Sequence, residues 1–276
     1  MKATLKDSMG TDLSVVNAAR VSFAKESHWL CYCEPKPDGT PTICTEHHKD
    51  NCGNLSATDT SLINFLARGM TEKDYGDLVE TLMDHSLDWT APEVEHFLWS
   101  FRNQPQHSSP FRHCFATFHV KAPVFVARQL VKHQVGMSWN EVSRRYVDDE
   151  PEFWMPTELL RSRSANKKQG SGDALTPEVN AHCVSALSRA VGTCQGIYET
   201  LIQQGVAPEM ARIILPQNTM TEWIWSGSLQ SWAHVCNLRC HPEAQKETRD
   251  LCLQIDEQCA KLWPVSWAAL RNGGGQ

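Results

Sequence analysis

The stretch from Arg128 to Tyr146 concentrates side chains that could bind an anion. Five residues that can carry a positive charge fall within 18 positions: Arg128, Lys132, His133, Arg144 and Arg145. These cations would repel one another unless an anion or acidic side chains lay between them. Phosphate suits such a cluster, because Arg gives it bidentate contacts and Lys a point charge. The cluster therefore indicates a phosphate site or, with equal weight, a solvated helix face paired with local Asp and Glu.

Two elements would position this cluster. Residues 113–121 alternate between apolar and polar side chains, which predicts a half-buried strand. The next stretch, 124–134, has helical periodicity and is closed by Gly136. On that helix Arg128 would lie one turn from Lys132, so both would face the same ligand.

Helical periodicity recurs along most of the remaining chain. Helices are predicted in five further stretches, where this periodicity occurs together with suitable caps or prolines: 10–23, 59–103, 177–204, 208–216 and 242–264. We find no internal repeat. The pattern predicts an α+β fold that is mostly helical around a small sheet.

The bulk composition is that of a globular protein. The chain has 276 residues, of which 41% are hydrophobic and 21% charged. No apolar run reaches the roughly 18 to 20 residues that span a bilayer, and the segment Met1 to Asp7 lacks the apolar core of a signal peptide. We therefore expect a cytoplasmic location, or the host cytoplasm if a virus encodes the chain. The net charge of −6 argues against nucleic acid as a partner, and a membrane is not expected either.

Residues 29–58 are rich in Pro and Gly, without helical or strand periodicity. They hold six potential metal ligands: Cys31, Cys33, Cys44, His47, His48 and Cys52. One interpretation is a structural zinc site, with Cys31, Cys33, Cys44, His47 and Cys52 as candidates, because zinc would order a loop without its own core. The other is a surface loop with reduced thiols, since the spacing matches no standard zinc finger. Cysteines at helical spacing are expected to be small core residues: Cys183, Cys194, Cys252 and Cys259.

The cationic stretch resembles the signature of the flavin-dependent thymidylate synthases. That signature is Arg-His-Arg, seven residues and then Ser, preceded by Arg-Gln and followed by Tyr. The corresponding residues here are Arg128-Gln129, Lys132-His133-Gln134 and Ser143-Arg144-Arg145-Tyr146. Four further blocks agree with the family in order: 9–23 (MGTDLSVVNAARVSF), 107–111 (HSSPF), 211–216 (ARIILP) and 237–245 (NLR, then AQ). Five collinear blocks make chance a poor explanation.

The resemblance implies the fold and the reaction of that family. It implies a homotetramer with a small, mainly antiparallel sheet and active sites shared between subunits. We then expect a single domain over residues 1–276, with a Cys/His-rich and helical insertion at about 25–106 and a disordered tail at about 270–276. The implied reaction converts dUMP to dTMP, with methylenetetrahydrofolate as one-carbon donor and NADPH-reduced FAD as hydride source.

Carried over residue by residue, the family's dUMP site falls on eight positions: Gln129, Lys132, Glu141, Ser143, Arg144, Arg145, Arg212 and Arg239. Arginines would contact the phosphate. Arg239 would be the catalytic residue: facing the uracil edge, it favours ionisation at N3 and so raises the electron density at C5. No catalytic cysteine is expected. The FAD would lie along another set of residues: Ser109, Lys132, His133, Gln134, Glu141, Ser228, Gln230 and His234.

The flavin side of the signature departs from the family. Lys132 and Gln134 stand where the family has arginines, and eight residues rather than seven separate Gln134 from Ser143. Gln230 takes the place of a further arginine. Lys cannot stack on a planar ring as a guanidinium can, and Gln carries no charge. Two alternatives follow: a divergent relative that makes another C5-modified pyrimidine nucleotide, such as a hydroxymethyl product, and a non-catalytic nucleotide- or metal-binding protein.

Overall fold

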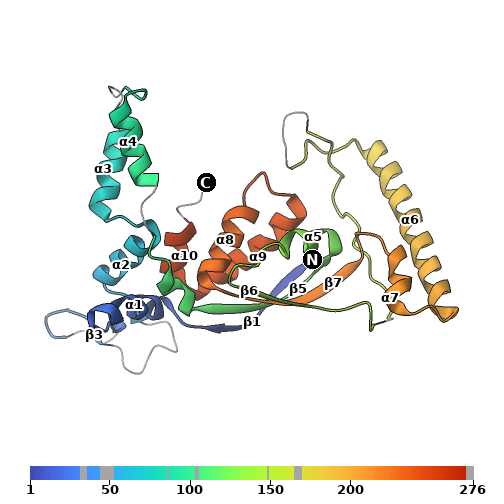
Figure 1. The fold of residues 1–276 in the computed structure, drawn as a ribbon, viewed down its shortest axis with the longest axis horizontal. Helices are drawn as coiled ribbons and strands as arrows, with labels where there is room; N and C mark the ends of the chain where they lie inside the picture. The colour runs from blue at the N-terminus through green and yellow to red at the C-terminus, as the bar shows by residue number, and fades with distance from the viewer. Residues whose placement is uncertain are drawn as a thin grey trace. The chain divides into compact units, whose positions relative to one another are not determined.

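The computed structural model describes residues 1–31, 36–43, 53–84, 86, 88–102, 106–147, 149–164 and 170–271. The α-helices are α1 (Asp12–Arg20), α2 (Ala57–Arg68), α3 (Glu72–Met83), α4 (Pro92–Arg102), α5 (Val124–Leu130), α6 (Pro177–Gln203), α7 (Pro208–Ala211), α8 (Leu229–Arg239), α9 (Lys246–Leu262) and α10 (Pro264–Arg271). The strands are β1 (Lys2–Met9), β2 (Leu30–Cys31), β3 (Thr42–Ile43), β4 (Gly53–Asn54), β5 (Phe115–Pro123), β6 (Met137–Glu141) and β7 (Met220–Ser228). Short 3₁₀ helices are η1 (Val21–Phe23), η3 (Ser109–His113) and η4 (Arg212–Ile214). These elements confirm the α+β prediction (Figure 1).

The chain folds as two compact units. Unit 1 comprises Met1–Asp7, Ala116–Gly227 and His234–Gln258, and unit 2 comprises Ser8–Phe115, Ser228–Ala233 and Cys259–Gln276. Within each unit, segments far apart in the sequence become neighbours. Whether the chain behaves as a single domain with an insertion stays a prediction. None of the helices in the described part of the chain is long and apolar enough to cross a membrane.

A four-stranded sheet in the order β1-β5-β7-β6 is the framework of unit 1. β5 is the predicted half-buried strand, with buried side chains at alternate positions from Ala116 to Val120. The edge strand β6 pairs antiparallel with β7, so that Trp139 lies opposite Trp225. Trp139 also stacks on the buried Trp223, with ring centroids 4.3 Å apart. This aromatic burial holds the edge strand in register.

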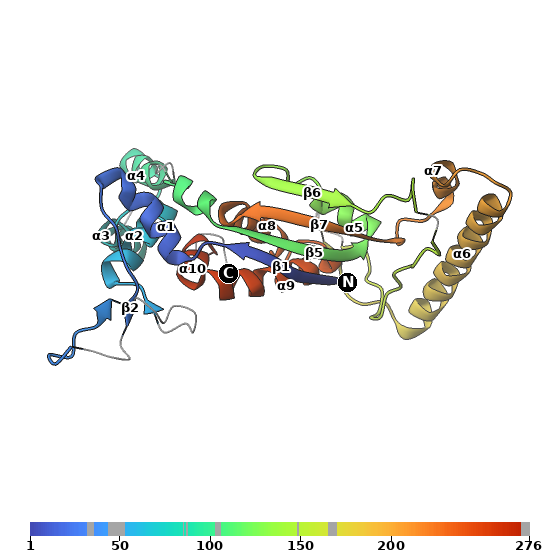
Figure 2. The ribbon, with the colours of Figure 1, turned by 90° about the horizontal axis from the view of Figure 1, so that it is seen from below.

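Helices α5 and α9 cover one face of this sheet, as the two views in Figures 1 and 2 show. Leu130 at the end of α5 is fully buried, as are Leu251 and Ile255, which lie about one turn apart on α9. The predicted long helix is confirmed as α6, which ends just before Gly205, whose φ is +82°. Glycine tolerates this left-handed conformation, so it ends the helix cleanly.

Unit 2 begins its first helix at the predicted cap. Thr11 forms a capping box with Ser14 at the start of α1. The next residue, Asp12, is 3% exposed, and its carboxylate accepts hydrogen bonds from the N–H groups of Val265 at 3.0 Å and Ser266 at 2.8 Å. These donors belong to the first turn of α10, so Asp12 caps a helix that lies far away in the sequence. Burial raises the pKa of Asp12.

The structure corrects the prediction that residues 29–58 lack strands. In the described part of this segment, β2 pairs antiparallel with both β3 and β4, and Leu30 lies opposite Ile43 and Asn54. Each strand is two residues long, too short to leave a readable alternation in the sequence.

Two helix boundaries are also corrected. The helix predicted over 124–134 ends at Leu130, because the chain turns there to bring β6 beside β7. The helix predicted from Pro242 begins at Lys246, after a turn in which the Ala244 N–H bonds the His241 carbonyl oxygen. Strands β1, β6 and β7 and helices α8 and α10 are absent from the predicted elements.

Candidate active site

The loop between α5 and β6 carries three of the predicted site residues. The His133 N–H bonds the Leu130 carbonyl oxygen at 3.0 Å, which closes a turn at the helix end, and Gly136 follows with a φ of +67°. Lys132 and Gln134 are exposed, whereas His133 between them is half-buried. The predicted one-turn helical spacing of Arg128 and Lys132 is therefore wrong, because α5 ends before Lys132.

His133 meets Arg239, which comes from the C-terminal end of α8. Arg239 Nε donates to His133 Nε2 at 2.9 Å, and Nη2 donates to the Gln129 carbonyl oxygen at 3.3 Å. Burial, together with the charges of Arg239 and His234, lowers the pKa of His133 to about 4. At neutral pH this imidazole is therefore uncharged and accepts through Nε2, which places its proton on Nδ1. The two contacts fix the plane of the guanidinium.

Arg239 and Gln129 line one cavity of unit 1, of about 560 Å³, together with Asn237 and Gln245; we call it the Arg239 cavity. The Gln129 amide donates to Gln245 Oε1, and Gln245 Nε2 donates to Glu247 Oε2 at 3.0 Å. A guanidinium and several planar amides offer donors and acceptors in fixed directions. Such a set suits the polar edge of a flat heterocycle.

A second cavity of unit 1, of about 620 Å³, is lined by Glu141, Arg144 and Arg212; we call it the Glu141 cavity. Glu141 is held at both carboxylate oxygens, by Thr221 Oγ1 at 2.7 Å and by Trp139 Nε1 at 3.1 Å. Its position follows from the β6–β7 register, which places it on the same face as the tryptophans. Among the described residues, the cavity shares no lining residue with the Arg239 cavity.

The remaining residues predicted to bind the nucleotide phosphate either follow Glu141 closely in the sequence or line the Glu141 cavity. Ser143, Arg144 and Arg145 form a turn, in which the Tyr146 N–H bonds the Ser143 carbonyl oxygen at 3.0 Å. Arg145 Nε donates to Ser143 Oγ at 3.0 Å, and its guanidinium lies over the Tyr146 ring at 4.9 Å. Arg212 Nε donates to the Glu209 carbonyl oxygen at 3.2 Å. Each guanidinium keeps further N–H groups that could donate to an anion.

The predicted flavin residues divide between the two units: Lys132, His133, Gln134, Glu141 and His234 in unit 1, and Ser109, Ser228 and Gln230 in unit 2. In unit 1, His133 and His234 come together edge to face, with ring centroids 6.0 Å apart. In unit 2, Ser228 precedes α8, and its Oγ accepts the Ser231 N–H at 3.3 Å, as a helix cap does. Gln230 Oε1 is buried and has no hydrogen-bond partner among the described residues.

Ser109 lines a cavity of unit 2 of about 760 Å³, with Phe65, His107 and Arg20. Phe65 stacks on His107, with ring centroids 5.4 Å apart. Arg20 is held at the wall by an ion pair with Asp59, with Nη2 and Oδ1 2.5 Å apart. The cavity offers aromatic surface and polar groups to a ligand of moderate size.

The structure leaves the predicted zinc site in the insertion untested. Cys31 is buried in β2. The other candidates lie outside the described residues: Cys33, Cys44, His47, His48 and Cys52. Of the four cysteines predicted to be core residues, Cys252 and Cys259 are buried as expected, whereas Cys183 and Cys194 on α6 are only half-buried.

Four residues that hold or line the site are absent from the predicted set. Asn237 and Gln245 belong to a matched sequence block, so the resemblance contained a signal for them. Thr221 on β7 and Trp139 on β6, the strand that also carries Glu141, donate hydrogen bonds to the Glu141 carboxylate. A side chain that buttresses a ligand-binding group carries no motif of its own.

Comparison with known proteins matches residues 4–265 to the Thy1 family, described as thymidylate synthase complementing protein. A flavin-dependent thymidylate synthase of Thermus thermophilus is 32% identical over 268 residues, which cover 97% of this chain and 74% of that protein. The one from Ruegeria pomeroyi is 40% identical over 60% of this chain and 56% of that protein. The crystal structure of PolB from Streptomyces cacaoi, a UMP/dUMP methylase bound with 5-Br dUMP, superposes with a TM-score of 0.68 and 25% identity over 99% of this chain and 95% of PolB.

The fold and the matched motifs thus point to one class of protein. Because the match covers almost the whole chain, this protein belongs to the flavin-dependent thymidylate synthase family. The resemblance read from the motifs is confirmed.

Proposed function

We propose that this protein is a flavin-dependent thymidylate synthase that converts dUMP to dTMP, with methylenetetrahydrofolate as one-carbon donor and NADPH-reduced FAD as hydride source. The observation that carries the proposal is the pairing of Arg239 with a neutral His133 in a cavity lined by Gln129. Uracil C5 is a weak carbon nucleophile. A guanidinium at the ring edge favours the N3-ionised form, and this raises the electron density at C5.

His133 is a positioning residue in this proposal. By accepting the Arg239 Nε proton, it holds the guanidinium in one plane and leaves other N–H groups directed to the nucleotide. A protonated imidazole at this site would repel Arg239 instead. The low pKa of His133, about 4, therefore keeps the pair intact at neutral pH.

The phosphate of dUMP is assigned to the Glu141 cavity and its neighbours Ser143 and Arg145. Arg144 and Arg212 at the cavity wall offer charge-assisted, bidentate contacts to an anion. Lys132, exposed on the loop after α5, adds a point charge. Glu141, fixed by Thr221 and Trp139, would accept hydrogen bonds from the sugar or the base.

A site shared between copies of the chain accounts for the two separate cavities. We infer that the Arg239 cavity of one subunit and the Glu141 cavity of another contribute to the same nucleotide site in a homotetramer. Helix α6 supports an oligomer, because Val179, Leu187 and Ile197 on its apolar side are 49%, 44% and 43% exposed. Apolar side chains in such a stripe are typical of a surface that a second chain covers.

The residues present fit a flavin. Gln230 Oε1, buried without a partner among the described residues, could accept a hydrogen bond from a ligand N–H or O–H group. By the family resemblance, the flavin is assigned to Ser109, Lys132, His133, Gln134, Glu141, Ser228, Gln230 and His234. When bound, a flavin carries the hydride that NADPH provides. The protein's own part is to bind, orient and exclude water.

The test is a product assay with the purified chain, dUMP, methylenetetrahydrofolate, FAD and NADPH. We expect bound flavin to colour the protein yellow, NADPH to be oxidised only when dUMP is present, and the nucleotide to gain the mass of one CH₂. Arg239→Ala should lower turnover about 100-fold or more while the circular dichroism spectrum is unchanged. Arg68→Ala, on α2, is the matched control and should keep activity. Near-normal turnover of Arg239→Ala would remove Arg239 from its role.

A hydroxymethylating relative is the second candidate, favoured by Lys132, Gln134 and Gln230 in place of arginines. The same assay separates the two products, because a hydroxymethyl group adds CH₂O rather than CH₂. A plain methyl group as the only product would eliminate the second candidate.

A further inference from the structure

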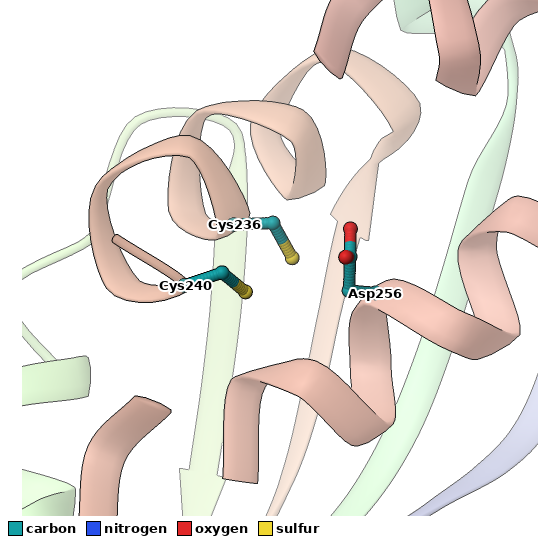
Figure 3. Close-up of side chains that lie close together, drawn as sticks. All are labelled: Cys236, Cys240 and Asp256. Atoms are coloured by element: carbon teal, nitrogen blue, oxygen red, sulfur yellow. The ribbon is translucent and has the colours of Figure 1, made fainter. Parts of the chain in front are cut away.

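Two thiols and a carboxylate converge where α8 ends beside α9, and the proposed reaction uses none of them. Figure 3 shows Cys236 of α8 and Cys240, the residue that follows the end of α8, projecting toward Asp256 on α9. The helical turn itself brings the thiols together, with the Cys240 N–H bonding the Cys236 carbonyl oxygen at 2.9 Å. All three residues belong to unit 1.

The three ligand atoms have the spacing that one metal ion requires. They all lie within 4.8 Å of one another. A point equidistant from three atoms at that separation lies about 2.8 Å from each, whereas Zn–S is about 2.3 Å and Zn–O is about 2.0 to 2.2 Å. An inward shift of about half an ångström at each side chain would complete the coordination, which rotamer adjustment can supply.

The donor set selects the kind of ion. Two sulfurs and one carboxylate oxygen suit zinc, whereas magnesium and calcium prefer oxygen ligands alone. Cys240 and Asp256 are only half-buried, so water can reach the fourth position of a tetrahedral site. Cys252, one turn before Asp256, is fully buried. Among the described residues, its sulfur does not belong to the group of ligand atoms that lie within 4.8 Å of one another, so the fourth position is assigned to water.

We propose that Cys236, Cys240 and Asp256 form a zinc-binding site that joins α8 to α9. Binding would release the two thiol protons to solvent, so that Zn²⁺, two thiolates and one carboxylate leave a net charge of −1. Arg239, the residue before Cys240, offsets this charge. The ion would fix the end of α8 that carries Arg239, and so would stabilise the wall of the Arg239 cavity.

The experiment must separate this site from the thiols of the insertion. We would prepare the full chain with Cys33→Ser, Cys44→Ser and Cys52→Ser, strip metal under reducing conditions, and titrate Zn²⁺ against a chromogenic chelator. The expected result is one equivalent of zinc bound. Adding Cys240→Ser should abolish that binding, and adding Asp256→Asn should weaken it about tenfold or more. Cys194→Ser on α6 is the matched control and should leave it unchanged.

Cobalt provides a second readout that does not depend on activity. Co²⁺ bound by two thiolates absorbs in the near ultraviolet by charge transfer from sulfur, and Cys240→Ser, which abolishes binding, should remove that absorbance. Zinc should also protect two thiols from a thiol reagent. A folded triple-Ser chain that binds no zinc would overturn the proposal, as would binding that Cys240→Ser leaves unchanged.

If the triple-Ser chain does not fold, a further variant tests the same site. Cys236→Ser with Cys240→Ser, made in the otherwise unaltered chain, should lower the zinc stoichiometry by one equivalent. An unchanged stoichiometry in that variant would overturn the proposal.

Discussion

His133 contacts Arg239, so the protonation state of His133 affects the stability of the folded chain. The pKa of His133 is about 4 in the folded chain and about 6.5 in an unfolded one. Between these values the unfolded chain binds a proton that the folded chain does not. Stability should therefore fall as pH drops from about 6.5 to about 4, by on the order of 2 kcal/mol at the lower end.

Urea unfolding at about pH 7 and about pH 5 measures this effect. His133→Gln keeps an acceptor for Arg239 but does not titrate, so its stability should change less between the two pH values than that of the unaltered chain. His182→Gln, at an exposed position of α6, should behave like the unaltered chain. Equal pH dependence in the unaltered chain and in His133→Gln would contradict the assigned protonation state.

The sequence predicted the residue types of the site better than their contacts. Arg239 and Gln129 were placed at the nucleotide by their motifs, and the structure brings them to one cavity. His133 was expected only along the flavin, and the structure adds its bond to Arg239. That contact joins residues 106 positions apart in the chain, and no local pattern encodes such a distance.

Asp12 illustrates how one element stabilises another. Its buried carboxylate accepts two N–H groups at the start of α10, which would otherwise be unsatisfied inside unit 2. We expect Asp12→Ala to destabilise the chain by about 2 kcal/mol or more, because it removes the cap and leaves buried donors unpaired. Asp12→Asn keeps one carbonyl oxygen and should cost less.

Thermal unfolding compares these variants with Asp38→Ala. Asp38 caps an exposed turn by accepting from Thr40, so its loss should be nearly neutral. A melting temperature of Asp12→Ala equal to that of Asp38→Ala would show that the α10 cap contributes little.

Helices with strong periodicity were predicted well, and elements set by tertiary pairing were not. α1, α2, α4 and α6 follow from caps, prolines and apolar spacing in the sequence. β6 is an edge strand whose position depends on the aromatic face of β7, and α5 ends early because the chain must reach that edge. Short-range propensity does not contain this information.

At the scale of the molecule, the apolar side of α6 predicts an interface. We expect Leu187→Glu to shift the assembly from tetramer toward monomer, because it introduces a charge into a surface that a second chain would cover. Light scattering coupled to size exclusion would give the mass of each form. Arg189→Glu, about 200° around the helix from Leu187, is the control and should remain assembled. An unchanged mass of Leu187→Glu would place the interface elsewhere.

The claim that two cavities from different subunits act on one dUMP is the centre of the account. Arg239→Ala disables one cavity and Arg212→Ala the other, and each variant alone should be almost inactive. The decisive measurement is dTMP formation by mixed oligomers of the two variants, co-expressed with different tags and purified through both. Random assembly predicts that about a quarter of the sites are intact, so the mixed oligomers should regain about a quarter of normal activity. Mixed oligomers as inactive as either variant alone would contradict the shared site.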